Sequence, residues 1–299
     1  MLGGIDKTIV AVVLALVAAI SRLTGVPPAS PPPNPLVYVA LGDSYTSGPL
    51  VLPHDDTFVP QDCGQSTRNY PHIASQLIKA DVFRDVSCGG ATIDDFSAAH
   101  NAYAGSNVDP QYDALDASVD VVTIGIGGND VGFTGAALDC VQPPTQAGGT
   151  PCTSSFYENG VDTISRDIAA MKINLGDAIE HVRALAPNAK VLIVSYPTAM
   201  PDSGVGCYPY VPIFNEDMPY LVAKFKEMNA ALKSAALAHN ASYVDIYTPS
   251  IGHDACQPPG IAWINGAVLV PPSFPAHPND LSFLNSAPVV ADAIRSALA

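Results

Sequence analysis

Short apolar runs alternate along this chain with longer segments whose apolar residues recur every three or four positions. The short runs predict strands at Leu36–Leu41, Val82–Ser87, Val119–Ile126, Lys190–Ser195 and Ser242–Ile246. Several of them are apolar throughout, which is typical of strands covered on both faces. The longer segments predict amphipathic helices at about Tyr70–Lys79, Ile164–Leu185, Met218–Leu232 and Leu284–Leu298. This alternation predicts an α/β fold, a three-layer α/β/α sandwich with a central, mainly parallel sheet.

Three long stretches without a regular period interrupt the alternation: Thr134–Asn159, Tyr196–Asp217 and Tyr247–Pro275. Structureless loops of this length inside a compact domain are usually functional or held by disulfides. Each stretch begins after a predicted strand end, and open α/β sheets bind ligands at the carboxyl ends of their strands. We therefore expect the three loops to wall one cleft.

The N-terminus predicts export. Thr8–Ile20 carries no charge and is followed by Ser21 and Arg22, a run too short to span a bilayer comfortably but suited to the apolar region of a secretory signal. The alternative is an uncleaved anchor that tethers the chain to a membrane. Pro27–Pro35 then reads as an extended Pro-rich linker. Residues 1–35 are thus predicted to be signal or anchor plus linker, and residues 36–299 the folded domain.

The charge balance narrows the possible partners. The 299 residues include 28 acidic and 13 basic side chains, for a net charge of −15, which argues against nucleic acid and against an anionic membrane surface. Six cysteines in an exported chain suggest three disulfides, with fifteen possible pairings. If neighbours pair in order, the bridges are Cys63–Cys88, Cys140–Cys152 and Cys207–Cys256. No CxxC spacing or EF-hand pattern is present, so neither a metal nor another cofactor is predicted.

Two segments in the first third of the chain are candidates for chemistry. Gly42-Asp43-Ser44 directly follows the first strand, where a serine hydroxyl would stand at the rim of the sheet; the alternative role for Ser44 is a helix N-cap. Gly90, in Cys88-Gly89-Gly90-Ala91-Thr92, could present a backbone N–H to the cleft, because glycine allows close approach and unusual φ angles. The alternative there is an ordinary turn.

Two further segments would complete such a site. Asn129, in Gly127-Gly128-Asn129-Asp130, carries an uncharged amide suited to stabilising an oxyanion, although a Gly-Asn turn is the simpler interpretation. The GxGxxG dinucleotide spacing is absent. His277 lies just before the last helix, and histidine is the usual base for a serine hydroxyl. His253, in a loop, is the second candidate base.

These four segments together resemble the SGNH (GDSL) esterase and lipase family, from Val37 to the last helix. The CGGAT stretch, the Gly252–Cys256 loop, Trp263–Gly266 and the spacing of the six cysteines are similar to its secreted bacterial branch. The resemblance implies a flavodoxin-like SGNH hydrolase fold and sequential disulfides. It also implies that Ser44 attacks an ester carbonyl, that His277 takes the serine proton, and that Ser44 N–H, Gly90 N–H and the Asn129 side chain form the oxyanion hole.

One position departs from the family pattern. The family usually has Asp three residues before this histidine, and here that residue is Phe274. Something must still hold the imidazole tautomer. We predict a backbone carbonyl from residues 273–275, in the first place that of Phe274, with the carboxylate of Asp280 as the alternative.

The sequence thus predicts a secreted or cell-envelope serine carboxylester hydrolase that cleaves a small-molecule or lipid ester through an acyl-enzyme, and that is a monomer. The alternatives are an acyltransferase that shares the acyl-enzyme, and a non-catalytic lipid- or glycan-binding envelope protein. Apolar residues of the long loops either form an acyl pocket or pack the loops themselves: Tyr196, Met200, Tyr208, Tyr210, Phe214 and Trp263.

Overall fold

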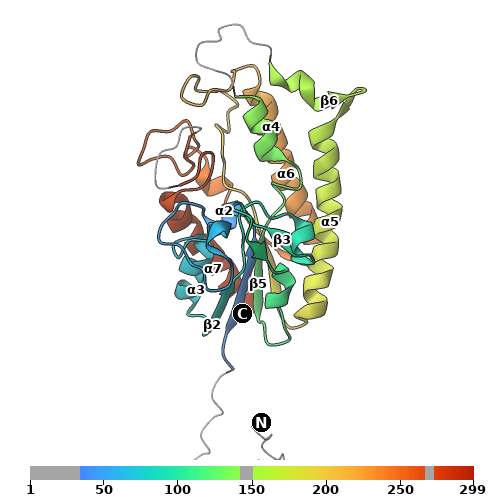
Figure 1. Ribbon diagram of the computed structural model, residues 1–299, viewed down its shortest axis with the longest axis vertical. Helices are drawn as coiled ribbons and strands as arrows, with labels where there is room; N and C mark the ends of the chain where they lie inside the picture. The colour runs from blue at the N-terminus through green and yellow to red at the C-terminus, as the bar shows by residue number, and fades with distance from the viewer. Residues whose placement is uncertain (1–33, 142–150, 267–272) are drawn as a thin grey trace, which may run out of the picture. The chain divides into compact units, whose positions relative to one another are not determined.

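A five-stranded sheet forms the centre of the molecule (Figure 1). The computed structural model describes residues 34–141, 151–266 and 273–299, and the chain from Leu36 onwards is one compact unit. The strand order is β2-β1-β5-β8-β9, and every pairing is parallel. The strands are β1 (Val37–Gly42), β2 (Val82–Asp85), β5 (Val121–Gly125), β8 (Lys190–Val194) and β9 (Ser242–Val244). The five predicted strands and the parallel sheet are therefore confirmed.

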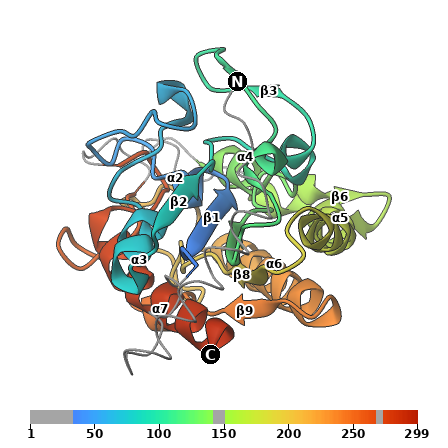
Figure 2. The ribbon, with the colours of Figure 1, turned by 90° about the horizontal axis from the view of Figure 1, so that it is seen from below.

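Two pairs of helices cover the two faces of the sheet (Figures 1 and 2). Alternate side chains of β1 point to opposite faces: Val39 packs with helices α5 and α6, and Tyr38 with α3 and α7. The four helices are α3 (Tyr70–Ile78), α5 (Thr163–Leu185), α6 (Met218–Ala238) and α7 (Asp280–Leu298). This arrangement confirms the α/β/α sandwich. Side chains at the start of three helices accept backbone N–H groups and so fix where each begins: Asn69, Asp162 and Asn279.

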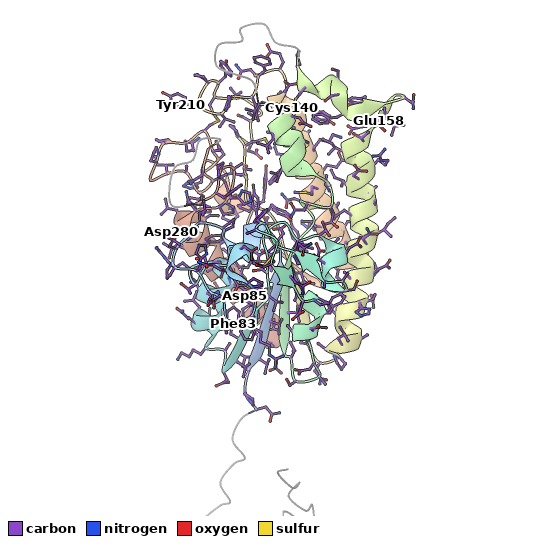
Figure 3. All side chains as sticks on the ribbon, viewed as in Figure 1. Phe83, Asp85, Cys140, Glu158, Tyr210 and Asp280 are labelled. Carbon is purple, nitrogen blue, oxygen red and sulfur yellow. A yellow bond between two sulfur atoms is a disulfide. The ribbon has the colours of Figure 1, made fainter. Side chains whose placement is uncertain are left out.

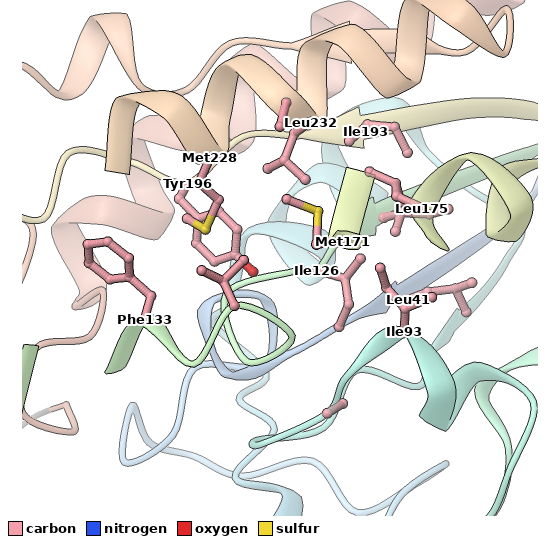
Figure 4. Packing of buried hydrophobic residues seen from close by; sticks show 14 of the residues in the cluster. Leu41, Ile93, Ile126, Phe133, Met171, Leu175, Ile193, Tyr196, Met228 and Leu232 are labelled. Atoms are coloured by element: carbon pink, nitrogen blue, oxygen red, sulfur yellow. The ribbon is translucent and has the colours of Figure 1, made fainter. Parts of the chain in front are cut away.

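The core between the sheet and α5/α6 lies directly beneath the carboxyl ends of the strands. Met171 and Leu175 of α5 are buried against Ile126, just beyond β5, and against Leu232 of α6 (Figure 4). Gly127 follows Ile126 with φ +120°, and a methyl group there would lie 3.1 Å from the Met171 sulfur. The loop after β5 therefore rests on a close-packed floor.

Several short elements were not predicted. They are α2 (Ser44–Ser47), α4 (Phe133–Asp139), the hairpin β3 (His100–Asn101) with β4 (Asn107–Val108), and the hairpin β6 (Tyr157–Glu158) with β7 (Val161–Asp162). The stretch from Thr134 was expected to be irregular, but Phe133 and Ala136 are buried and anchor α4. Elements of two to seven residues are too short to show a period in the sequence.

Three disulfides join the loops: Cys63–Cys88, Cys140–Cys152 and Cys207–Cys256. This is the sequential pairing. In the described part of the chain, no cluster of three or more His, Cys, Asp or Glu side chains could hold a metal ion. No helix within those same residues is both long and apolar enough to cross a bilayer. The predicted signal and linker, residues 1–35, lie outside the described residues apart from Asn34 and Pro35.

Candidate active site

Ser44 stands at the carboxyl end of the sheet, one residue after the turn that ends β1. Asp43 caps α2 through its side chain, which accepts the Tyr45 N–H at 2.9 Å, and Ser44 is the first helical residue. A side chain at Gly42 would lie 2.4 Å from Thr46 Oγ1 and 2.7 Å from the Gly125 carbonyl. Glycine at position 42 therefore lets β1 turn sharply against β5. The predicted N-cap role belongs to Asp43, which leaves the Ser44 hydroxyl free for another partner.

That partner is His277. Its Nε2 lies 2.8 Å from Ser44 Oγ, and the two side chains are only 3% and 4% exposed. His277 Nδ1 lies 2.8 Å from the Pro275 carbonyl oxygen. Because a carbonyl only accepts, Nδ1 carries the hydrogen and Nε2 is left to accept the serine O–H. This is the tautomer that a general base needs.

The group that orients His277 is not the one we predicted. The Phe274 carbonyl accepts the backbone N–H of His277 at 3.2 Å and does not face the ring. Asp280 is the first residue of α7, and its carboxylate pairs with Arg68 at 3.1 Å. The Pro275 carbonyl, inside the predicted range of residues, takes the position of the missing Asp.

Ala276 explains why the Pro275 carbonyl reaches the ring. Its φ of +57° is rare for a residue with a side chain and turns the chain back on itself between Pro275 and His277. Tyr45 Oη donates to the Ala276 carbonyl at 2.6 Å, and Ala276 N–H donates to the Asn265 carbonyl at 3.0 Å. Tyr45 directly follows the candidate nucleophile Ser44, so one residue links the serine turn to the histidine turn.

The candidate oxyanion donors follow the carboxyl ends of β1, β2 and β5, and Asn129 lines the same crevice as Ser44. The Asn129 amide donates one hydrogen to the Ala91 carbonyl at 2.8 Å, which fixes its orientation and leaves the second hydrogen free to bind. Gly90 has φ +86°. Among residues 34–141, 151–266 and 273–299, no backbone carbonyl accepts the N–H of Gly90 or of Ser44. These three groups are thus available to an oxygen bound in the cleft.

A buried network supports the loop that carries Asn129. Tyr196, at the end of β8, donates a short hydrogen bond to Asp43 Oδ2 and accepts the Gly128 N–H at 2.7 Å. Burial raises the pKa of Asp43 to about 7, although the Tyr196 and Tyr45 hydrogen bonds lower it. Asp130 accepts the Ile93 N–H at 3.0 Å, and burial raises its pKa to about 6. The loops after β1, β5 and β8 are therefore tied to one another.

The surroundings of His277 favour its neutral form. Burial lowers the pKa of His277, opposed by the hydrogen bond to the Pro275 carbonyl. The Tyr45 ring lies 5.0 Å from the imidazole centroid, and the Phe274 ring meets it edge-on at 5.2 Å. A histidine whose pKa is lowered in this way is neutral at neutral pH and ready to accept a proton.

A narrow crevice of about 20 Å³ opens beside Ser44 and Asn129; its apolar lining is Tyr45, Phe133, Tyr196, Phe225 and Met228. Of the loop residues considered for an acyl pocket, only Tyr196 lines it. Trp263 instead stacks on His253 at 4.3 Å. Tyr210 is 81% exposed, in the upper part of the view in Figure 3.

The second candidate base is not brought to the nucleophile. His253 Nδ1 bonds to the Ile261 carbonyl at 2.7 Å, and its ring is held against Trp263. The sequence analysis did not predict two contacts of this site, Tyr45 with the Ala276 carbonyl and Tyr196 with Asp43. No local pattern in the sequence signals them, apart from the position of Tyr45 next to the candidate nucleophile.

The comparisons with known proteins agree with this geometry. The model of the GDSL-like lipase/acylhydrolase family matches residues 40–281. A lipase from Streptomyces coelicolor, Lipase 2, is 39% identical over 250 residues, covering 82% of this chain and 81% of its own. An esterase from Streptomyces scabiei is 28% identical over 303 residues, covering 89% and 88%. The chain belongs to the GDSL-like lipase/acylhydrolase family.

Solved structures show the same fold. An extracellular lipase from Streptomyces rimosus superposes with a TM-score of 0.69 at 25% identity, covering 86% of this chain and 99% of the lipase. A phospholipase A1 from Streptomyces albidoflavus superposes with a TM-score of 0.70 at 24% identity, again covering 86% of this chain and 99% of the other. With its family and fold established, the protein is a carboxylic ester hydrolase of the esterase or lipase type.

Proposed function

We propose that this protein is a secreted serine carboxylester hydrolase that works through an acyl-enzyme on Ser44. The observation that carries the proposal is the 2.8 Å contact between Ser44 Oγ and His277 Nε2, with Nδ1 held by the Pro275 carbonyl. A serine hydroxyl is a weak nucleophile until a base within hydrogen-bond reach removes its proton.

The reaction follows from this arrangement. Ser44 Oγ attacks the ester carbonyl as its proton moves to His277 Nε2, and the carbonyl electron pair becomes an oxyanion. Ser44 N–H, Gly90 N–H and the free Asn129 amide hydrogen stabilise that charge. The carbon–oxygen bond to the alcohol then breaks, and His277 gives its proton to the departing oxygen. Water repeats these steps on the acyl-enzyme and releases the acid.

The test is a steady-state assay with 4-nitrophenyl butyrate. Ser44→Ala and His277→Ala should each lower kcat by at least about 10³-fold, because triad-type residues act as a unit. Ser296→Ala, exposed on α7, is the matched control and should keep full activity. Acid-quenched wild-type protein should carry a butyryl group on the peptide containing Ser44. Equal turnover by Ser44→Ala and wild type would remove Ser44 from the mechanism.

The secreted location rests on separate support. An uncharged run ends at Ile20, three disulfides hold the loops, and the Streptomyces rimosus lipase is described as extracellular. If the full chain is expressed in a secreting bacterium, N-terminal sequencing of protein from the medium should give a start within residues 21–35. An intact chain retained on the cells would instead support the membrane anchor.

A further inference from the structure

Tyr103 lies over the turn that carries Gly90. In the sequence it is far from both members of the catalytic dyad and belongs to no motif that the sequence analysis singled out. A methyl group on Gly89 would lie 2.4 Å from Tyr103 Cε2, and one on Gly90 would lie 3.5 Å from Cε1 and 3.9 Å from the hydroxyl. Only glycine at position 89 leaves room for this ring. Gly89 and Gly90 therefore have a second role besides presenting a backbone N–H: without side chains, they leave a surface on which the Tyr103 ring packs.

The hairpin that carries Tyr103 is fixed to this turn. The Asp62 carboxylate accepts the N–H groups of Ala104 and Ser106 at 3.0 and 3.1 Å. Asp62 precedes Cys63, which is bonded to Cys88, and the Cys63 carbonyl accepts the Gly89 N–H at 2.8 Å. The tip of the β3–β4 hairpin and the Gly89–Gly90 turn are thus held by one loop, so the position of Tyr103 is built into the fold.

Tyr103 contacts Ser44 directly and is connected to His277 through Phe274. Its ring stacks on Phe274 with 6.3 Å between centroids and 9° between planes, and Phe274 meets His277 edge-on. Burial and the Asp43 carboxylate raise the pKa of Tyr103, and a hydrogen bond with Ser44 opposes them. The residue as a whole is nevertheless 61% exposed, so part of its ring surface is open to a ligand.

The geometry assigns this aromatic wall, Tyr103 with Phe274, to one side of the substrate. In the proposed reaction His277 must protonate the departing alcohol, so the alcohol part of the ester lies next to the imidazole and to Phe274. The crevice lined by Phe133, Tyr196 and Met228 lies on the Asn129 side, which leaves it to the acyl part.

We propose that Tyr103 is a specificity-determining residue that contacts substrate, and that its stack with Phe274 forms the subsite for the alcohol part of the ester, with a preference for flat or aromatic alcohols. The proposal rests on the proposed function, because it uses the direction in which His277 delivers its proton. An open aromatic face prefers a second ring in an offset or edge-on arrangement.

The experiment varies the alcohol at constant acyl chain. Benzyl butyrate and ethyl butyrate are compared in a pH-stat for wild type, Tyr103→Ala, Tyr103→Leu and Tyr103→Phe. We expect Tyr103→Ala and Tyr103→Leu to raise KM for benzyl butyrate by about 2- to 12-fold, the effect of one aromatic pair, with kcat nearly unchanged. KM for ethyl butyrate should change less than about twofold, and Tyr103→Phe, which keeps the ring, should restore the wild-type preference.

Controls separate the possible failures. Tyr210→Ala removes an exposed tyrosine outside this wall and should leave both KM values unchanged. The ratio of the KM for ethyl octanoate to the KM for ethyl butyrate should be the same in wild type and in Tyr103→Ala. Equal effects on the benzyl and ethyl esters, or a change that follows acyl length, would overturn the assignment of Tyr103 while leaving the role of Ser44 intact. Full activity in Ser44→Ala would instead overturn the proposed function itself.

Discussion

Asp43 is a buried carboxyl group directly before the proposed nucleophile. Its replacement by Asn tests how much the ionisation of this group changes the free energy of unfolding. The residue is 1% exposed, and burial raises its pKa from 3.8 to about 7 against the opposing hydrogen bonds from Tyr196 and Tyr45. Because this folded-state pKa lies above the unfolded value, the folded protein binds more protons between about pH 4 and 7. The stability that protonation contributes is complete below about pH 4 and is lost as the pH rises through about 7.

The size of the loss follows from the two pKa values. The difference between 3.8 and about 7, at about 1.4 kcal/mol for each pKa unit, corresponds to about 4 kcal/mol. Asp43→Asn does not titrate, so its free energy of unfolding relative to wild type should rise by up to about 4 kcal/mol between pH 4 and 8. The amide nitrogen would face the Tyr196 hydroxyl less favourably, but that cost is the same at every pH and does not alter the difference.

Urea unfolding followed by circular dichroism, with the disulfides intact, measures this difference at pH 4, 6 and 8. His277 and Asp130 titrate in both proteins, so their contributions largely cancel. Asp109→Asn changes an exposed carboxylate and should track wild type throughout. The reasoning would be refuted if Asp43→Asn differed from wild type by the same amount, within about 1 kcal/mol, across the whole range.

Three further outcomes are expected. Asn129→Ala should lower kcat by about 10²–10³-fold and barely move the urea midpoint, since within the described residues its side chain makes a single hydrogen bond, to the Ala91 carbonyl. A large loss of stability in this variant would point to a structural role. Because burial lowers the pKa of His277, the acid limb of kcat/KM should lie below pH 6.5, and a limb above pH 7 would contradict a neutral His277 base. Replacing both Cys63 and Cys88 by Ser should cost about 3 kcal/mol and also lower kcat, because Cys88 leads into Gly89–Gly90. The matched variant with Cys207→Ser and Cys256→Ser should lose stability but keep more of its kcat. If this variant instead lost more kcat than the Cys63 and Cys88 variant, the Cys63–Cys88 disulfide would not be needed to position the Gly89–Gly90 turn.

The sheet and its four long helices could be predicted from the sequence because their signal is local and repeated. Strands such as Val121–Gly125 are buried along their whole length. The apolar stripe of α5 is buried as its spacing predicts at Ile164, Ile168, Met171, Leu175, Ile179 and Val182, whereas its last member, Leu185, is exposed at the end of the helix. Parallel strands then bring their carboxyl ends to one edge. That rule placed the Ser44 turn beside the Asn129 loop, and Gly42 does pair with Gly125 in the register of β1 with β5.

The group that orients His277 shows where such reasoning stops. Phe274 in place of the usual Asp pointed to a carbonyl among residues 273–275, but which carbonyl faces the ring depends on the conformation of Ala276. Alanine gives no sign of a positive φ in the sequence, and its conformation is held by Tyr45, 231 residues away, and by Asn265. Tyr103 is similar, because its seat exists only once Gly89 and Asp62 are brought together. Local patterns therefore predict which residues reach the edge of the sheet, whereas distant contacts decide which atoms face each other there.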